Sequence, residues 1–182
     1  MDNTKERLEF YKEIYYFELN RKDNLKSKLI IPSSITALFF TVIGYLFRNL
    51  KAAPSGLLGV LFIVSFVLLF LSFIYNIYNF FKAWQGDKYA YLPKSTEMEE
   101  YWHELEKAYS EPEVVKEKFN TFLIKELKKH NDQNFKNNKR LAETLLKIHK
   151  TIIVSLVFTI VSLVCLYGPQ FYFIINNILC CK

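Results

Sequence analysis

The stretch that decides the fold is TIIVSLVFTIVSLVCLY, residues 151–167, which contains no charged residue. At the rise of an α-helix it covers about 25 Å, enough to cross the hydrocarbon core of a bilayer. Two other uncharged blocks, residues 29–47 and 56–81, are also long enough to span. The sequence therefore predicts an all-α membrane protein with three transmembrane helices and a helical segment between the second and third spans.

The polar residues of the third span follow a helical period. Thr151, Ser155, Thr159 and Ser162 recur at intervals of three or four residues, which places them on one helical face. Such a stripe is typical of a packing seam, because small hydroxyl residues let membrane helices approach closely. It is also typical of the lining of a narrow water path. The two roles are compatible in a homo-oligomer, and both interpretations stay open at this stage.

The first two spans carry polar or small positions of their own. Asn76 and Asn79 share a face near the end of the second span, beside an aromatic belt typical of a membrane interface. Headgroup or interhelical hydrogen bonding accounts for them, and a constriction ring in an oligomeric pore is the alternative. The first span has a stripe of small residues, which predicts a close-packing face. This stripe consists of Ser34, Ala37, Thr41 and Gly44.

Lys and Arg are distributed unevenly around the spans. There are seven before the first span, two in the first loop, fourteen between the second and third spans, and one in the tail. The positive-inside rule therefore places the N-terminus and the central segment in the cytoplasm. We expect a cytoplasmic amphipathic helix at 1–28 and a transmembrane hairpin at 29–83. A cytoplasmic helical segment at 84–150 and a third transmembrane helix at 151–182 complete the chain.

Three local features qualify this plan. The repeat of Leu8, Tyr11, Tyr15 and Leu19 predicts that the N-terminal helix packs on the central helices or lies along the membrane surface. No Gly or Pro occurs between Pro112 and Gly168, so the central helix could run unbroken into the third span. The polar run HNDQNFKNN at 130–138 is the predicted place of a break, since Asn and Asp compete for backbone bonds. The Gly-Pro pair at 168–169 predicts a kink or break, followed by a kinked, interfacial or re-entrant tail.

The central segment changes sign along its length. Residues 97–117 hold eight Glu against two Lys, and residues 118–150 hold nine Lys or Arg against three acidic residues. Basic residues interleaved with aromatic ones suit contacts with phosphates and stacking on bases. A solvated face with lysines that anchor the inner leaflet is the competing interpretation. The predicted ligand-binding residues are Lys125, Lys128, Lys129, Lys136, Lys139, Arg140 and Phe135.

No catalytic or metal-binding pattern is present in the sequence. The three His are far apart, and H-E-x-x-H, P-loop and G-x-S-x-G motifs are missing. Cys165, Cys180 and Cys181 do not form a disulfide framework or a zinc set. Proton-coupled transporters generally need a charged group inside the spans, and none occurs there. We expect no enzyme activity, no cofactor and no metal.

Three stretches carry a resemblance that covers nearly the whole chain. They are LEFYKEIYYFELNRKDNLKSKLIIP at 8–32, YLPKSTEMEEYW at 91–102, and the run Asn134-x-x-Asn137-Asn138-x-Arg140-Leu141. With these stretches the chain resembles small bacterial membrane effectors of anti-phage defence and is similar to the channel-forming effectors of the Hailong system. The resemblance implies a homo-oligomeric pore in the bacterial inner membrane, for example a tetramer. It also implies a gating oligodeoxyadenylate on the cytoplasmic face and a partner nucleotidyltransferase that makes it.

The leading hypothesis is therefore a homo-oligomeric ion channel gated on its cytoplasmic side by an anionic nucleotide or oligonucleotide. The alternative is a membrane anchor or scaffold without a pore, which docks a cytoplasmic partner protein through its charged helices. The predicted pore-lining residues are Thr151, Ser155, Thr159, Ser162, Asn76 and Asn79.

Overall fold

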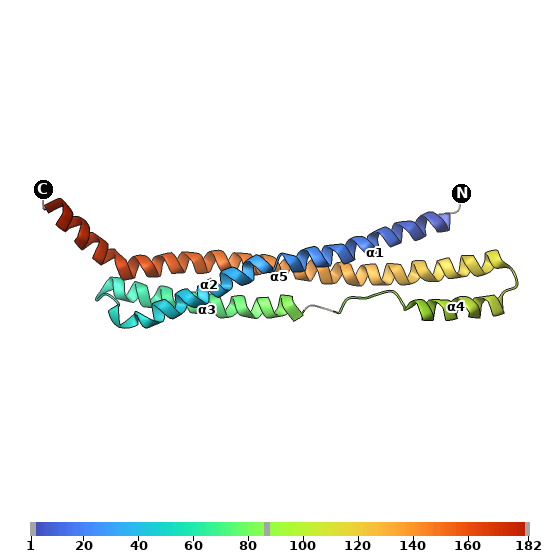
Figure 1. The fold of residues 1–182 in the computed structure, drawn as a ribbon, viewed down its shortest axis with the longest axis horizontal. Coiled ribbons are helices and arrows are strands. Elements are labelled where there is room, and N and C mark those ends of the chain that lie inside the picture. The colour runs from blue at the N-terminus through green and yellow to red at the C-terminus, as the bar shows by residue number, and fades with distance from the viewer. Residues whose placement is uncertain (1–2, 86–87, 181–182) are drawn as a thin grey trace. The chain divides into compact units, whose positions relative to one another are not determined.

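A computed structural model describes residues 3–85 and 88–180, and every element in these ranges is helical (Figure 1). Three stretches, 4–48, 57–85 and 112–170, contain windows long and apolar enough to cross a membrane. The predictions of an all-α chain and of three candidate spans are therefore confirmed. The elements are α1 (Asn3–Ser27), α2 (Ile30–Arg48), the 3-10 turn η1 (Leu50–Ala52), α3 (Leu57–Gln85), α4 (Ser95–Ala108) and α5 (Pro112–Cys180).

The chain divides into two compact units. One consists of Met1–Ser27 and Gly86–Ala142 and is called the polar unit below. The other consists of Lys28–Gln85 and Glu143–Lys182 and is called the apolar unit. The long helix α5 contributes its first part to the polar unit and its second part to the apolar unit.

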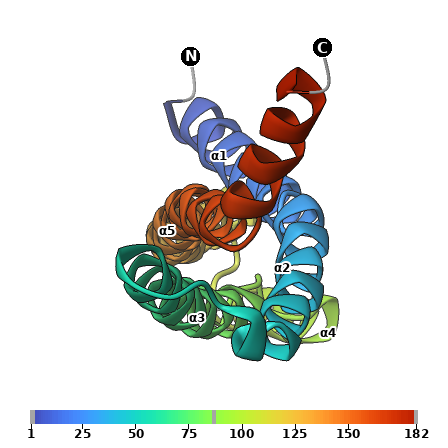
Figure 2. The ribbon, with the colours of Figure 1, turned by 90° about the vertical axis from the view of Figure 1, so that its left-hand side faces the viewer.

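In the apolar unit, α2, α3 and the second part of α5 pack together (Figure 2). The outward faces of the three helices carry exposed Ile, Leu, Val and Phe side chains. A water-soluble bundle would expose polar side chains instead, so this surface suits contact with lipid tails. The buried core is formed by Phe39, Ile43, Leu46, Phe62, Leu69, Phe73, Cys165 and Leu166.

The turn between α2 and α3 depends on two glycines. Gly56 has a φ of 72°, in the left-handed region that favours glycine. A Cβ atom on Gly59 would clash with the backbone carbonyl oxygen of Pro54. The chain therefore passes too close to the start of α3 for any side chain at position 59.

In the polar unit, α1 pairs with the first part of α5. Leu8 and Tyr15 of α1 form a buried cluster with Ile124 and Leu127 of α5. The predicted apolar face of the N-terminal helix thus packs on the central helix, which is one of the two expected arrangements. The short helix α4 packs through Tyr101 and Trp102 against two aromatic residues of α5, Phe119 and Phe122.

The predicted break in α5 at 130–138 is wrong, because the helix runs through this stretch without interruption. The Asn side chains there donate to the backbone of other segments and do not compete for the bonds of their own helix. The helix also continues through Pro169, and its last part, dark red in Figure 1, runs in a different direction from the rest. A break in the helix at the Gly-Pro pair is therefore not found, and the place of the tail relative to a membrane stays a prediction.

Candidate functional site

The hydroxyl residues of the third span lie buried between helices of the same chain. Thr151, Ser155, Thr159 and Ser162 are 0 to 8% exposed. Thr151 and Thr159 donate to carbonyl oxygens four residues earlier in α5, at 2.9 Å in both cases. Such bonds to the preceding turn satisfy a hydroxyl inside a membrane helix without a partner helix.

The two serines of this stripe contact serines of α3. The Oγ atoms of Ser162 and Ser65 are 2.9 Å apart, and those of Ser155 and Ser72 are 2.8 Å apart. The stripe therefore forms a packing seam between α3 and α5, with every hydroxyl hydrogen-bonded within one chain. A role in lining a pore stays a prediction, and it requires these two helices to separate.

Asn76 and Asn79 of α3 are also buried, at 1% and 3% exposed. The Nδ2 of Asn76 donates to Oγ1 of Thr36 on α2 at 2.8 Å, which is an interhelical hydrogen bond of the expected kind. The Nδ2 of Asn79 donates to the carbonyl oxygen of Tyr75 in its own helix at 2.8 Å. The Oδ1 of Asn76 is buried without a hydrogen-bond partner within the described chain. As found, both side chains face protein and not an open channel.

The small-residue stripe of α2 is exposed on the single chain. Ser34 and Thr41 donate to carbonyl oxygens of their own helix, those of Ile30 and Ala37. A Cβ on Gly44 would meet nothing within 4 Å. The predicted close-packing face is therefore not used between helices of one chain, and its role stays a prediction.

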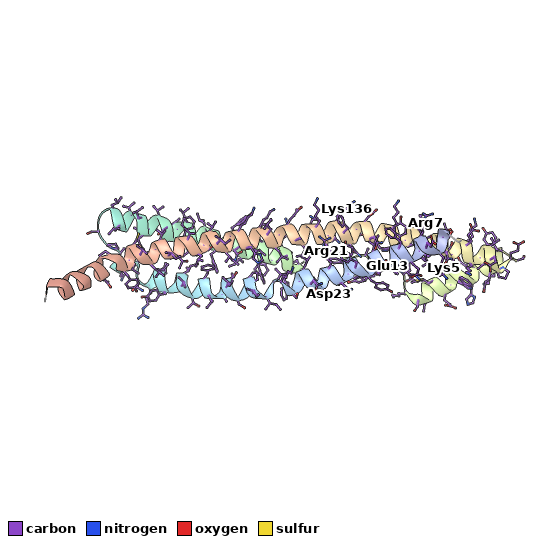
Figure 3. All side chains as sticks on the ribbon, turned by 90° about the horizontal axis from the view of Figure 1, so that it is seen from above. Lys5, Arg7, Glu13, Arg21, Asp23 and Lys136 are labelled. Carbon is purple, nitrogen blue, oxygen red and sulfur yellow. The ribbon has the colours of Figure 1, made fainter. Side chains whose placement is uncertain are left out.

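The predicted ligand-binding residues form one basic face of α5. All six cationic side chains and Phe135 are exposed. At 100° per residue the cations occupy about a third of the helix circumference, along about 22 Å. Asp132 is exposed within the same face, so it is not uniformly positive. Lys136 points away from the ribbon of α5 (Figure 3). The basic face comprises Lys125, Lys128, Lys129, Lys136, Lys139 and Arg140.

Arg21 of α1 adds a cation at the edge of the basic face. Its guanidinium carbon lies 5.8 Å from the ring centroid of Phe135, within range of a cation–π interaction. Sequence reasoning missed this residue, because nothing in the sequence indicates where α1 lies along α5. Phe135 remains 50% exposed, so part of the side chain is accessible to a ligand.

A second group of α5 residues holds the extended segment between α3 and α4. Ala90 donates its backbone N–H to Oδ1 of Asn134 at 2.9 Å, and Nδ2 of Asn134 donates to the Ala90 carbonyl at 3.0 Å. The Nε2 of Gln133 and the Nδ2 of Asn137 both donate to the carbonyl oxygen of Lys88, at 3.1 and 2.9 Å. We call Gln133, Asn134, Asn137 and Asn138 the amide clamp.

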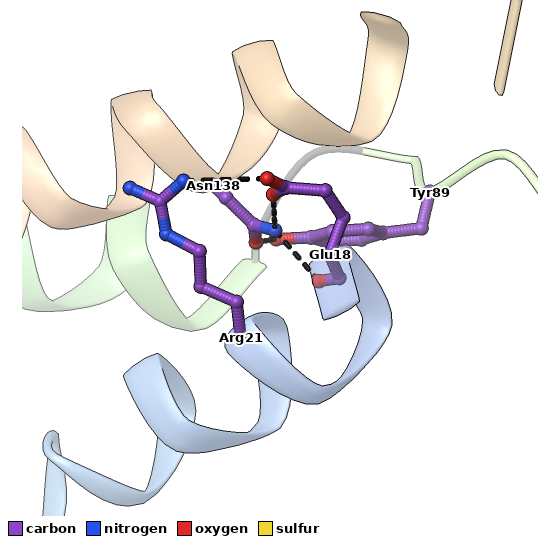
Figure 4. A network of polar contacts seen from close by, with 4 residues as sticks. All are labelled: Glu18, Arg21, Tyr89 and Asn138. Carbon is purple, nitrogen blue, oxygen red and sulfur yellow. Dashed lines mark hydrogen bonds and ion pairs between the residues drawn. The ribbon is translucent and has the colours of Figure 1, made fainter. Parts of the chain in front are cut away.

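Asn138 is the hub of a buried network (Figure 4). Its Nδ2 donates to the carbonyl oxygen and to Oε2 of Glu18, both at 2.7 Å, and its Oδ1 accepts from the Tyr89 hydroxyl at 2.7 Å. Nη1 of Arg21 lies 3.4 Å from the other carboxylate oxygen of Glu18. The network joins α1, the extended segment and α5. Within it the carboxylate of Glu18, which is only 4% exposed, is paired with the Arg21 guanidinium and accepts a hydrogen bond from the Asn138 amide.

Besides Glu106 of α4, whose pKa is lowered by hydrogen bonds from His103 and Trp102, two titratable groups of the polar unit have a shifted pKa. The hydrogen bond to the Tyr91 hydroxyl raises the pKa of Lys22, whose Nζ also lies over the rings of Tyr89 and Tyr91. Burial lowers the pKa of His130, and the nearby Glu126 carboxylate, 3.1 Å from Nε2, opposes this effect. Neither Lys22 nor His130 lies in an arrangement of residues that indicates acid–base catalysis.

Among the described residues, no group of three or more His, Cys, Asp or Glu is placed to hold a metal ion. A scan against protein-family models, a search of curated proteins and a search of solved structures each found no match. The basic face, the amide clamp and the hydroxyl seam are the features of the described chain that bear on its function.

Proposed function

We propose that this chain forms a homo-oligomeric ion channel in a bacterial inner membrane, gated by an anionic nucleotide or oligonucleotide in the cytoplasm. The observation that carries the proposal is the basic face of α5. Six cations and an exposed aromatic ring lie along one side of the helix that also carries the hydroxyl seam. The resemblance of the sequence to membrane effectors of anti-phage defence supports the same proposal, and with it a partner nucleotidyltransferase that supplies the ligand.

The chemistry of this face favours a phosphate-bearing ligand. Exposed lysines bind phosphates mainly by releasing condensed counterions, so affinity falls steeply as salt rises. Phe135, with Arg21 over one side of its ring, offers a stacking surface to a base. Together they suit a short single strand better than an acidic protein, which would not use the aromatic ring.

The hydroxyl seam suits the closed state of such a channel. Its two Ser–Ser pairs hold α3 to α5. Hydrogen bonds between membrane helices are worth about 0.6 kcal/mol each on average, so separating the pairs costs little. A ligand that binds the open state several-fold more tightly offsets that cost. Opening would turn Ser155, Thr159 and Ser162 toward water.

Single-channel recording from purified protein in a planar bilayer tests the proposal. Short oligodeoxynucleotides are added to one side, with salt as a second variable. We expect discrete current steps whose open probability changes with oligonucleotide and changes less at high salt. A silent bilayer, with assembly in the membrane verified, would contradict the channel.

A matched pair of substitutions tests the basic face. Lys128→Glu lies within it, and Lys116→Glu lies elsewhere on α5, where the side chain is also exposed. Lys128→Glu should weaken oligonucleotide binding about tenfold and lower the salt slope by about one, while Lys116→Glu should leave both unchanged. Equal effects of the two substitutions would show that oligonucleotide binding depends on the net charge of the chain and not on a binding site at the basic face.

A membrane anchor without a pore is the second candidate. It is favoured by the fact that all four hydroxyls of the seam are satisfied within one chain. Ser155→Cys distinguishes the channel from the anchor, because a charged thiol reagent reaches this position only if the seam opens to water. Labelling that rises with oligonucleotide supports the channel, and protection under all conditions supports the anchor.

A further inference from the structure

Residues 88–92, called the strap below, are extended backbone that side chains hold in place. Ala90 and Leu92 donate their backbone N–H groups to Oδ1 of Asn134 and to the hydroxyl of Tyr15, at 2.9 and 3.2 Å. Backbone N–H groups are normally satisfied by a helix or a sheet ladder. In the strap, side chains of α5 and α1 take that role.

The carbonyl oxygens of the strap are satisfied in the same way. The carbonyl of Lys88 accepts from Gln133 and Asn137, and that of Ala90 accepts from Asn134. Asn134 thus binds both polar groups of one residue, as a neighbouring β-strand would. Three members of the amide clamp, Gln133, Asn134 and Asn137, therefore bind the main chain of the strap, and the fourth, Asn138, accepts from the hydroxyl of Tyr89.

The apolar core of the polar unit does not depend on the strap. Its buried members, Leu8, Tyr15, Ile124 and Leu127, belong to α1 and α5. From the strap only Leu92 packs against this cluster, and it is partly buried. Tyr91 is 57% exposed. Removing the strap therefore exposes little apolar surface, whereas separating α1 from α5 exposes the whole cluster.

We propose that the strap is a releasable latch, which leaves the amide clamp while α1 and α5 stay paired. Its contacts are mostly polar bonds that water can replace, so its release is a local opening well below the free energy of global unfolding. The strap is part of the chain between α3 and α4, so its release frees this part from α5 and α1. The inference is independent of any channel activity, since it concerns only contacts inside the polar unit.

Hydrogen exchange of single backbone amides tests the latch, using the full chain in detergent micelles and urea below the unfolding transition. We expect the Ala90 and Leu92 amides to exchange at rates that urea does not change, because a local opening exposes little surface. Amides of α5 at 131–138 should exchange more slowly and speed up with urea. If the Ala90 amide showed the same urea dependence as those of α5, the strap would leave only on unfolding and the proposal would be overturned.

Substitution of the clamp sharpens the test. Asn134→Leu removes both hydrogen bonds to Ala90. We expect the backbone amide of Ala90 to exchange about tenfold faster and the exchange rates of the α5 amides to stay unchanged. Lys136→Leu, exposed two residues away, is the matched control and should change neither. Tyr15→Phe keeps the buried ring and removes the acceptor of the Leu92 N–H, so it should speed Leu92 alone. Tyr15→Phe provides the test if Asn134→Leu does not fold. If neither variant changed the exchange rates of Ala90 and Leu92, the proposal would be overturned.

Discussion

The polar and apolar units place polar groups in their interiors by opposite means. In the polar unit the buried polar residues are mostly amides, and they bridge segments far apart in the sequence. In the apolar unit they are mostly hydroxyls, which bond to their own helix or to one neighbour across the seam. The outer surfaces are reversed as well, with Lys and Glu exposed on one unit and Leu, Ile, Val and Phe on the other.

This difference shows what specifies each unit. An amide has a donor and an acceptor on a side chain long enough to reach another segment, so it fixes which residues lie opposite one another. A hydroxyl is short and mostly bonds to its own helix, so its main effect is to let two helices approach. The polar unit should therefore respond to loss of hydrogen bonds, and the apolar unit to changes in side-chain volume.

The largest effect is expected for Asn138→Leu. This substitution removes the amide that bonds to the buried Glu18 carboxylate and to the Tyr89 hydroxyl, which should destabilise the polar unit by about 3 kcal/mol. Urea unfolding followed by the fluorescence of Trp102, in a Trp84→Phe background, measures the change. Lys139→Leu, exposed on the next residue, should cost less than about 0.5 kcal/mol.

Equal stability of these two variants would contradict the view that directional bonds specify the polar unit. Asn138→Asp offers a finer test, because it keeps the acceptor for Tyr89 and places a second carboxylate beside Glu18. It should destabilise the unit at neutral pH, and lowering the pH should restore part of the loss as one of the paired carboxylates takes up a proton.

In the apolar unit the corresponding test changes the volume of a buried side chain and measures the stability of the unit. Ser162 is fully buried against α3, so Ser162→Leu should destabilise the unit by about 1–3 kcal/mol through overpacking. Ser162→Ala removes the hydrogen bond and keeps the close approach, so its cost should be about 0.6 kcal/mol. Thermal unfolding in micelles compares the two. A tolerated Leu would mean that α3 and α5 separate readily, and would favour an open seam.

The sequence predicted the parts of the structure that depend on local periodicity. The three spans, the apolar face of α1, the hydroxyl stripe and the basic face follow from residues three or four apart. The polar run at 130–138 was wrongly interpreted as a helix break, because the partners of Asn131 and Asn138 on α1 are 120 residues away in sequence. Arg21 was missed for the same reason. A polar run inside a helix gives no sign of whether another segment will satisfy it.

Coupling energies compare a buried hydrogen bond of the apolar unit with one of the polar unit, and they are expected to be smaller than the effects above. A double-mutant cycle on Ser65→Ala and Ser162→Ala should give a coupling energy of about 0.6 kcal/mol. The cycle on Tyr89→Phe and Asn138→Ala should give about 1–2 kcal/mol, because Tyr89 bonds to an amide already polarised by Glu18. A serine coupling equal to or above the tyrosine coupling would remove the distinction drawn between the units.

The smallest expected effect is a pH dependence confined to the polar unit. Burial lowers the pKa of His130 below its usual value of 6.5, with Glu126 opposing and Lys129 assisting the shift. As the pH falls through about 6.5, the unfolded chain takes up a proton before the folded one, so this contribution is complete above 6.5 and is lost below it. His130→Gln should flatten the stability profile between about pH 7.5 and 5.5, by less than about 1 kcal/mol. An unchanged slope in His130→Gln would mean that water reaches the ring, and that the amide-lined side of α5 is less sheltered than its hydrogen bonds indicate.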